Sequence, residues 1–206
     1  DDLYAEALSK AGVDEKKISV IPNGVDLENF RIESSKRNQW RIITVANLKK
    51  VKGLSYLIKA LALVTEQFPN IELILAGDGP EEKNLKILTR NCKLEQNVKF
   101  MGRISHEHLP RWLNSANIFV LPSLAEGQGV VILEAMACGA VPIGTKIGGI
   151  PEVISDGSNG FLVNAADEQL LARSIMKLLS NPDQVELFRD RNLNLVKQYA
   201  WTDIIL

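Results

Sequence analysis

Short apolar runs alternate with amphipathic stretches along most of the chain. The runs are as long as buried strands, and the stretches between them place apolar residues three or four positions apart, as helices do. The predicted strands cover residues 40–46, 71–76, 98–101, 117–121, 141–144 and 160–163. Strands that alternate with helices form parallel sheets through right-handed crossovers. The pattern therefore predicts an α/β fold with a doubly wound, Rossmann-like parallel sheet of about six strands, covered on both faces.

The helices are predicted from stripes of apolar residues, from capping residues and from prolines that begin or break a helix. Residues 53–68 form the clearest helix, because their apolar side chains recur on one stripe. Pro80 is expected to open the next helix, and Ser105 to cap a helix that runs to about residue 116. Pro151 begins a short helix, and the tail from residue 167 is predicted to be helical, with a break near Pro182.

The two ends of the chain do not fit this domain. Residues 1–12 predict a short amphipathic helix, which leads into a turn at 22–26, and a polar stretch at 34–39 precedes the first strand. Residues 199–201 begin another helix at the other end. We therefore expect a terminal helix and lead-in segment left from an interdomain connection at 1–38. A Rossmann-like domain follows at 39–199, and a truncated C-terminal helix starts at 200–206.

The composition excludes several classes of protein. Lysine and arginine total 24 against 25 acidic residues, which argues against nucleic acid or a polybasic membrane contact as partner. No apolar run approaches the roughly 18 residues of a transmembrane segment. Cys92 and Cys138 are far apart and match no metal spacing, so we expect reduced thiols in a cytoplasmic protein. His106 and His108 are expected at the surface, where they face different ways and make a poor metal pair.

The most informative stretch is residues 126–139, which places two glutamates eight positions apart. In one continuous helix, steps of about 100° would leave Glu126 and Glu134 about 80° apart, off a common face. Glu126 therefore needs the turn between Gly127 and Gly129 to bring it to the start of the helix. Two acceptors beside a helix N-terminus suit a polyhydroxyl ligand that carries phosphate. The alternative is structural: Glu126 caps the helix and Glu134 pairs with a nearby lysine or arginine.

Seven segments in order along the chain resemble one enzyme family. They comprise residues 21–26, 52–53, 76–80, 98–102, 122–123, 126–139 and 148–152. Together they resemble the C-terminal, donor-binding domain of the retaining GT-B glycosyltransferases, in the large group often called family four, over about residues 18–201. The resemblance implies one half of a GT-B fold. That half binds a nucleoside-diphosphate sugar, of UDP or GDP type, for transfer to an acceptor hydroxyl in glycan, lipid or polysaccharide biosynthesis.

The resemblance also implies roles for single residues. Lys52 matches the lysine that contacts the donor diphosphate and stabilises the charge on the leaving group. Glu126 matches the glutamate beside the donor sugar, so Lys52 and Glu126 are the catalytic candidates. Glu134 matches the glutamate that holds the ribose hydroxyls, for which we expect a largely buried side chain directed at the cleft. Without nucleotide, its carboxylate is expected to be satisfied by water or a backbone donor.

The remaining donor contacts are implied mainly through the backbone. Residues 129–131 would offer N–H groups to sugar or phosphate, and residues 101–103 would meet the edge of the base. The whole donor set consists of Asn47, Lys52, Gly53, Gly77, Met101, Gly102, Arg103, Gly127, Gln128, Gly129, Val130, Val131 and Glu134. In the predicted sheet, Asn47, Gly77, Gly102 and Ser123 gather at the carboxyl ends of the strands, where open α/β sheets bind ligands.

Two positions depart from the family. Asn47 stands where many members carry a second diphosphate-binding arginine, so the clamp is weaker or Lys49 or Lys50 takes that part. Gln128 stands where many members have phenylalanine, which affects the contacts on the sugar side. Lys52 also has a simpler interpretation, as a solvated lysine in a basic run.

The resemblance implies no cofactor and no metal, and it implies a missing N-terminal domain as partner. That domain would supply the acceptor site and any membrane contact, so the chain is expected to bind nucleotide without turning it over. Two alternatives come from other classes. A nicotinamide-binding domain would need Gly-x-Gly-x-x-Gly after its first strand, where residues 47–53 have one glycine. A non-catalytic nucleotide-binding or scaffold domain of the same fold is the other.

Overall fold

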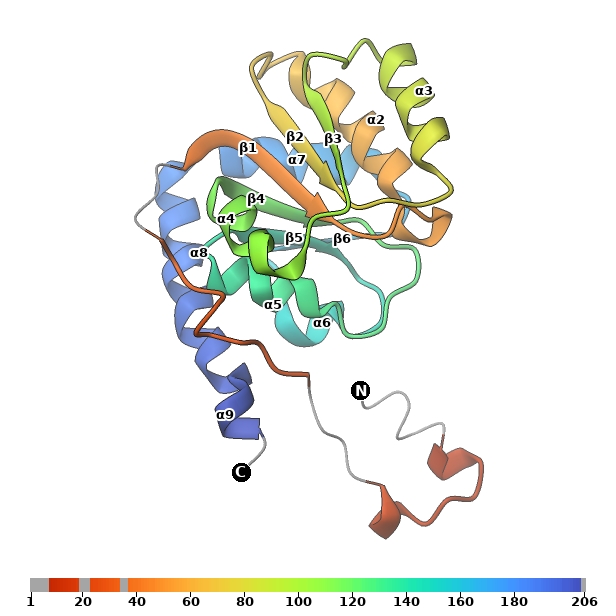
Figure 1. Cartoon of the computed structure of the whole chain (residues 1–206), viewed down its shortest axis with the longest axis vertical. Helices are drawn as coiled ribbons and strands as arrows, with labels where there is room; N and C mark the ends of the chain where they lie inside the picture. Colours follow the sequence, from red (N-terminus) through yellow and green to blue (C-terminus); the bar gives the residue numbers. More distant parts are fainter. Residues whose placement is uncertain (1–7, 19–22, 34–36, 205–206) are drawn as a thin grey trace.

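The computed structural model describes residues 8–18, 23–33 and 37–204, and it contains one sheet of parallel strands (Figure 1). The strand order is β3-β2-β1-β4-β5-β6. The strands are β1 (Asn38–Val45), β2 (Glu72–Ala76), β3 (Val98–Gly102), β4 (Ala116–Leu121), β5 (Val141–Thr145) and β6 (Phe161–Val163). Every neighbouring pair is parallel, which confirms the predicted doubly wound α/β fold.

Helices cover both faces of this sheet. Most follow a strand directly, as the alternating pattern predicts. They are α2 (Leu54–Thr65), α3 (Glu82–Asn91), α4 (Leu109–Asn114), α5 (Val130–Ala137), α6 (Ile150–Val153), α7 (Glu168–Leu179), α8 (Pro182–Leu195) and α9 (Trp201–Ile204). Short 3-10 turns are η1 (Glu15–Lys17), η2 (Lys50–Lys52), η3 (His106–His108) and η4 (Val196–Tyr199). Among the described residues, no helix is both long and apolar enough to cross a membrane.

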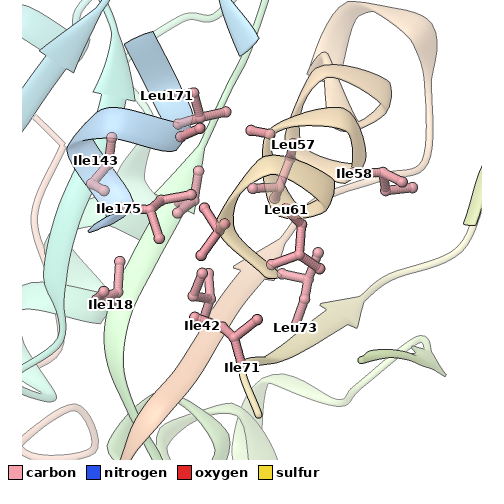
Figure 2. Packing of buried hydrophobic residues seen from close by; sticks show 14 of the residues in the cluster. Ile42, Leu57, Ile58, Leu61, Ile71, Leu73, Ile118, Ile143, Leu171 and Ile175 are labelled. Atoms are coloured by element: carbon pink, nitrogen blue, oxygen red, sulfur yellow. The ribbon is translucent and has the colours of Figure 1, made fainter. Parts of the chain in front are cut away.

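One hydrophobic cluster joins the sheet to α2, α3 and α7. Figure 2 shows side chains of α2 and α7 meeting those of the central strands, with Leu61 and Ile175 among them. Alternate strand residues such as Ile42 and Ile118 belong to this cluster, whereas Ile43 and Phe119 belong to the cluster on the other face. This alternation follows from the two-residue period of a strand. Because both faces are buried, the strands read as nearly continuous apolar runs.

The second cluster is built around α5. Five of its residues are buried, namely Ile132, Leu133, Ala135, Met136 and Ala137, so α5 lies inside the molecule. It packs against α4, α8 and η4. The lead-in segment also enters this cluster, because Val25 and Phe30 are only 2% and 1% exposed. Burial on nearly all sides fixes the direction of α5, and with it the place of its N-terminus.

One predicted helix needs correction, and parts of the predictions for the N-terminal segment lie outside the described residues. The single helix predicted from Ser105 to about residue 116 is wrong: the 3-10 turn η3 precedes α4, which ends at Asn114. The Ser105 side chain makes no cap, and its carbonyl instead accepts from the N–H groups of His108 and Leu109. In the predicted helix at 1–12, residues 8–10 are helical, and residues 1–7 lie outside the described part. Residues 19–22, which include Pro22 of the turn at 22–26, lie outside it as well.

The carboxyl ends of the strands converge as predicted. Ala46 donates to the carbonyl of Ala76 at 3.0 Å, and Gly77 donates to the carbonyl of Gly102 at 2.7 Å. A side chain at Gly77 would place its Cβ 1.9 Å from the carbonyl oxygen of Ala46, at a φ of 138°. Only glycine allows these loops to approach so closely. The loops after β1, β2, β3 and β4 therefore gather at one edge of the sheet.

Candidate functional site

Lys52 lies in a tight loop between β1 and α2 that is tied to the loop after β4. The N–H groups of Leu124 and Ala125 donate to the carbonyl of Val51, at 2.7 and 3.3 Å. Gly53 then turns the chain into α2 with a φ of 62°, and a Cβ there would lie 2.0 Å from the carbonyl oxygen of Pro122. These contacts fix the two loops against each other and determine where the Lys52 side chain can reach.

The Lys52 ammonium forms an ion pair with Glu126. Its Nζ lies 2.8 Å from Oε2 of Glu126, and the two side chains are 21% and 12% exposed. The same carboxylate oxygen accepts from Ser123 Oγ at 2.9 Å, and Thr145 Oγ1 holds the carbonyl of Ser123 at 2.7 Å. Lys52 is therefore not a solvated lysine of a basic run. Glu126 does not act as a helix cap either, because no side chain caps α5.

The N-terminus of α5 follows Glu126 after one turn. Gly129 is the N-cap residue with a φ of 61°, which swings the chain from the glutamate into the helix as the sequence predicted. Gly149 donates to the carbonyl of Gly127 at 2.7 Å, so the loop after β5 braces this turn. The positive end of the α5 dipole and the backbone N–H groups of residues 129–131 thus follow Glu126 directly along the chain.

Glu134 forms a separate contact, with a residue that the sequence did not single out for it. Its side chain is 13% exposed, and its Oε1 lies 2.8 Å from Nε2 of His106. The largely buried position is as predicted, and His106 belongs to η3, beyond the carboxyl end of β3. The partner is a correction, because water or a backbone donor was expected and the structural alternative named lysine or arginine. No sequence signal joins two residues 28 positions apart on different elements.

Comparison with known protein families shows which family the chain belongs to. Residues 26–194 match the family model described as "Glycosyl transferases group 1". The chain belongs to the group 1 glycosyltransferases. A relative from Schizosaccharomyces pombe, the gpi3 subunit of phosphatidylinositol N-acetylglucosaminyltransferase, is 31% identical over 200 residues. That alignment covers 95% of this chain but 43% of the relative, so the chain spans less than half of the relative's length.

Solved structures agree on the fold of this group 1 glycosyltransferase. The C-terminal domain of the group 1 family protein LpcC from Francisella tularensis superposes with a TM-score of 0.80 at 27% identity, over 86% of this chain and 100% of that one. Anabaena HepE, solved with UDP and with UDP-glucose, gives a TM-score of 0.86 at 26% identity, over 98% of this chain and 58% of HepE. The fold is that of the C-terminal half of a GT-B glycosyltransferase.

The two positions that depart from the family lie differently. Gln128 is half-buried, and its Oε1 accepts from the backbone N–H of Asn23 at 3.2 Å, which ties the glycine turn to the lead-in segment. Asn47 is exposed at the end of β1, and its carbonyl accepts from the N–H of Lys49. The Gln128 side chain therefore makes a definite structural contact, whereas the Asn47 side chain is exposed to solvent.

The remaining candidate residues, 101–103, lie at the carboxyl end of β3. Met101 and Arg103 are exposed, and Gly102 between them is bridged to Gly77. In the described ranges, no three histidine, cysteine or acidic side chains are grouped as they would be around a metal ion. The structure thus joins Lys52 with Glu126, pairs Glu134 with His106, and places residues 101–103 at the same edge of the sheet.

Proposed function

We propose that this group 1 glycosyltransferase chain is the donor-binding half of a retaining enzyme. The enzyme moves a sugar from a nucleoside-diphosphate sugar to an acceptor hydroxyl, without a metal. The observation that carries the proposal is the contact between Lys52 and Glu126 at the carboxyl edge of the sheet. This is where open α/β sheets bind their ligands. The complexes of HepE with UDP and UDP-glucose support a donor of UDP type.

In the proposed mechanism, the donor opens the ion pair. The Lys52 ammonium exchanges the Glu126 carboxylate for the diphosphate, which is the group that gains charge as the reaction proceeds. The bond between the anomeric carbon and the diphosphate oxygen breaks, and its electron pair leaves with the nucleoside diphosphate. The acceptor oxygen bonds to the same carbon on the same face, and its proton passes to an oxygen of the departing diphosphate. Lys52 and the N-terminus of α5 supply the positive charge that a metal supplies in other transferases.

Glu126 gains a new role when Lys52 leaves it. Its Oε2 stays held by Ser123, and its Oε1, which accepts from the Gly127 N–H at 3.3 Å, also accepts from a sugar hydroxyl. A carboxylate beside the reacting carbon also stabilises the positive charge that develops there. The exchange therefore prepares two catalytic groups in one step, one for the leaving group and one for the sugar.

The nucleoside is bound further along α5, at Glu134. Glu134 accepts from the two ribose hydroxyls, and the backbone of residues 101–103 meets the base edge. The N–H groups of Gly129, Val130 and Val131 face the phosphate and sugar, where glycine permits close approach. Gly53, Gly77, Gly127 and Gln128 shape the loops around the donor, and Asn47 offers a neutral contact in place of a charged one.

The acceptor site is assigned to a region beyond these 206 residues, because the relatives are about twice as long as the segment they share with this chain. We propose that the enzyme is cytoplasmic, which the free thiols of Cys92 and Cys138 support. The partner domain closes over the donor and brings the acceptor to the anomeric carbon. The present chain is expected to bind nucleotide without turnover.

Calorimetry with UDP, GDP, ADP and uridine tests this proposal. Without a closing domain, we expect dissociation constants on the order of 0.1 to 1 mM for the preferred nucleotide, or about 4 to 5.5 kcal/mol. Lys52→Ala should weaken UDP far more than uridine, since the lost contact is to phosphate. Glu134→Ala should weaken both, since both carry the ribose. Binding should survive EDTA.

The matched control is Lys59→Ala, which removes an exposed ammonium from α2 and should leave every affinity unchanged. Equal binding of all ligands by the wild type, Lys52→Ala and Glu134→Ala would refute this site. That outcome would mean that the nucleotide binds in another pocket.

A further inference from the structure

His106 covers the carboxylate that we assign to the ribose. Its Nε2 lies 2.8 Å from Oε1 of Glu134, and its ring lies against Phe30, with centroids 4.8 Å apart. Phe30 is 1% exposed and belongs to the core, whereas the His106 side chain is 69% exposed. The histidine ring is therefore in tilted contact with a buried phenylalanine on one side, and the rest of it is exposed at the rim of the site.

We propose that His106 is a removable cover on Glu134. The histidine occupies the ribose-binding carboxylate before nucleotide binds, and it leaves the carboxylate when the ribose hydroxyls bind. The inference rests on the proposed function, because it takes Glu134 to be the ribose contact. His106 is then a positioning residue, and it lowers the affinity for every nucleoside by competing with the ribose.

The competition follows from the small free surface of Glu134. Two vicinal hydroxyls need both carboxylate oxygens, and the side chain is only 13% exposed, so little of it remains open beside His106. His106 is the partner that can move. It belongs to the three-residue turn η3, and its exposed ring can swing into solvent without opening the core. Phe30 stays buried when the ring leaves.

The charge of the ring makes the competition depend on pH. Histidine is the side chain whose charge ordinarily changes between pH 5 and 8, and a hydrogen bond between two charged groups is stronger than one to a neutral ring. Glu134 faces His106 from α5, and Asp26 from the lead-in segment acts on it through charge; Glu107 and His108 are its neighbours in η3.

Asp26 does not take part in the exchange. Its carboxylate is held by the side-chain amide of Asn29 at 2.6 Å, and this bond keeps the pKa of Asp26 below its usual value. It therefore attracts a protonated His106 whether or not nucleotide is bound. Glu134 is the group whose contact with His106 is lost on binding, so acid should weaken nucleotide binding.

Two variants of His106 test the proposal by calorimetry with UDP at pH 6 and pH 8. His106→Ala should bind UDP more tightly than the wild type, by about twofold at pH 8 and about fivefold at pH 6. His106→Gln keeps a donor that cannot become charged, so it should bind as the wild type does at pH 8 and more tightly at pH 6. The ratio of variant to wild type at each pH cancels the titration of the ligand's own phosphate.

His108→Ala is the matched control, since it removes an exposed histidine from the same turn and should leave both affinities unchanged. Weaker or equal binding by His106→Ala at both pH values would overturn the inference. Glu134→Ala separates this failure from that of the proposed function. If Glu134→Ala weakens uridine while the His106 variants match the wild type, only the cover is wrong. If Glu134→Ala leaves uridine unaffected, the ribose assignment itself fails.

Discussion

Lys52 and Glu126 lie 74 positions apart in the chain, and the ammonium of one meets the carboxylate of the other at 2.8 Å. The pair connects the loop after β1 to the loop after β4, alongside the backbone bonds from Leu124 and Ala125 to Val51. The candidate site therefore holds one positive and one negative charge that neutralise each other. A diphosphate that enters it must compete with Glu126 for Lys52.

Replacing Glu126 with glutamine should therefore strengthen the binding of UDP. Glu126→Gln removes the charge that holds Lys52 and keeps an oxygen for Ser123, so UDP should bind about fivefold more tightly, with uridine unchanged. Calorimetry measures both. Glu107→Gln, which neutralises an exposed glutamate in η3, is the control and should change neither affinity. Weaker binding of UDP by Glu126→Gln would show that the carboxylate does not compete with the diphosphate.

Gly53 should be far less replaceable than a glycine of similar backbone conformation in open space. A Cβ at Gly53 would meet the Pro122 carbonyl oxygen at 2.0 Å, whereas Gly157, with a φ of 71°, has no heavy atom within 4 Å of such a Cβ. Gly157→Ala should cost about 1 kcal/mol of unfolding free energy from the left-handed backbone alone. Gly53→Ala should cost about 3 kcal/mol or more. Urea denaturation compares the two, and equal losses would mean that the loops separate freely.

Glu72 should give the protein an acid-sensitive part of its stability. Burial alone would raise the pKa of Glu72, but its bonds with Lys99 and with Arg41, whose Nε lies 2.5 Å away, outweigh burial and lower the pKa. A lowered pKa means stabilisation that is present above the usual pKa of a glutamate, about 4.3, and is lost as the pH falls through the folded value.

Glu72→Gln should therefore lower the unfolding free energy by about 1 kcal/mol at pH 7, and the difference should shrink towards pH 3. Chemical denaturation at several pH values gives the comparison. Glu82→Gln breaks the exposed pair of Glu82 and Lys86 on α3 and should cost less at every pH. A difference that stays constant down to pH 3 would rule out Glu72 as the source.

The two cysteines should differ in reactivity. Both are free thiols, as the sequence predicted, with Cys92 half-buried at the end of α3 and Cys138 buried at the end of α5. Burial raises the pKa of Cys138 to about 12, so almost no thiolate is present at pH 8. Ellman's reagent should therefore modify Cys92 first in the folded protein and both thiols in guanidinium. Equally fast modification of both in the folded state would contradict the buried position of Cys138.

The sheet could be predicted from the sequence because its signal is local. Buried parallel strands such as β2 and β4 are nearly continuous apolar runs, and each is bounded by glycine, proline or a helical stripe. The segment after Ser105 could not be predicted as well. Pro110 lies at the start of α4, and this left the residues from His106 to His108 as a separate 3-10 turn.

The candidate site was predictable in its members and not in its contacts. Lys52, Glu126 and Glu134 were singled out from a motif and a resemblance, and their roles stay predictions. The pairing of Lys52 with Glu126 depends on how two loops dock, and that of Glu134 with His106 on the distance between α5 and η3. Such contacts are set by tertiary packing, which no periodicity encodes. His106 looked like an ordinary surface histidine for that reason.

The lead-in segment and the C-terminal end are bound to each other through Val25. Its N–H donates to the carbonyl of Tyr199 at 2.7 Å, its carbonyl accepts from the N–H of Trp201 at 3.3 Å, and the Trp201 ring leaves no room for a side chain at Gly24. The N-terminal and C-terminal boundaries of the domain must consequently be chosen together when the protein is shortened. A truncation that removes one of these segments removes the backbone bonds of the other, so a shortened version must keep residues 23–25 and 199–201 together or remove both.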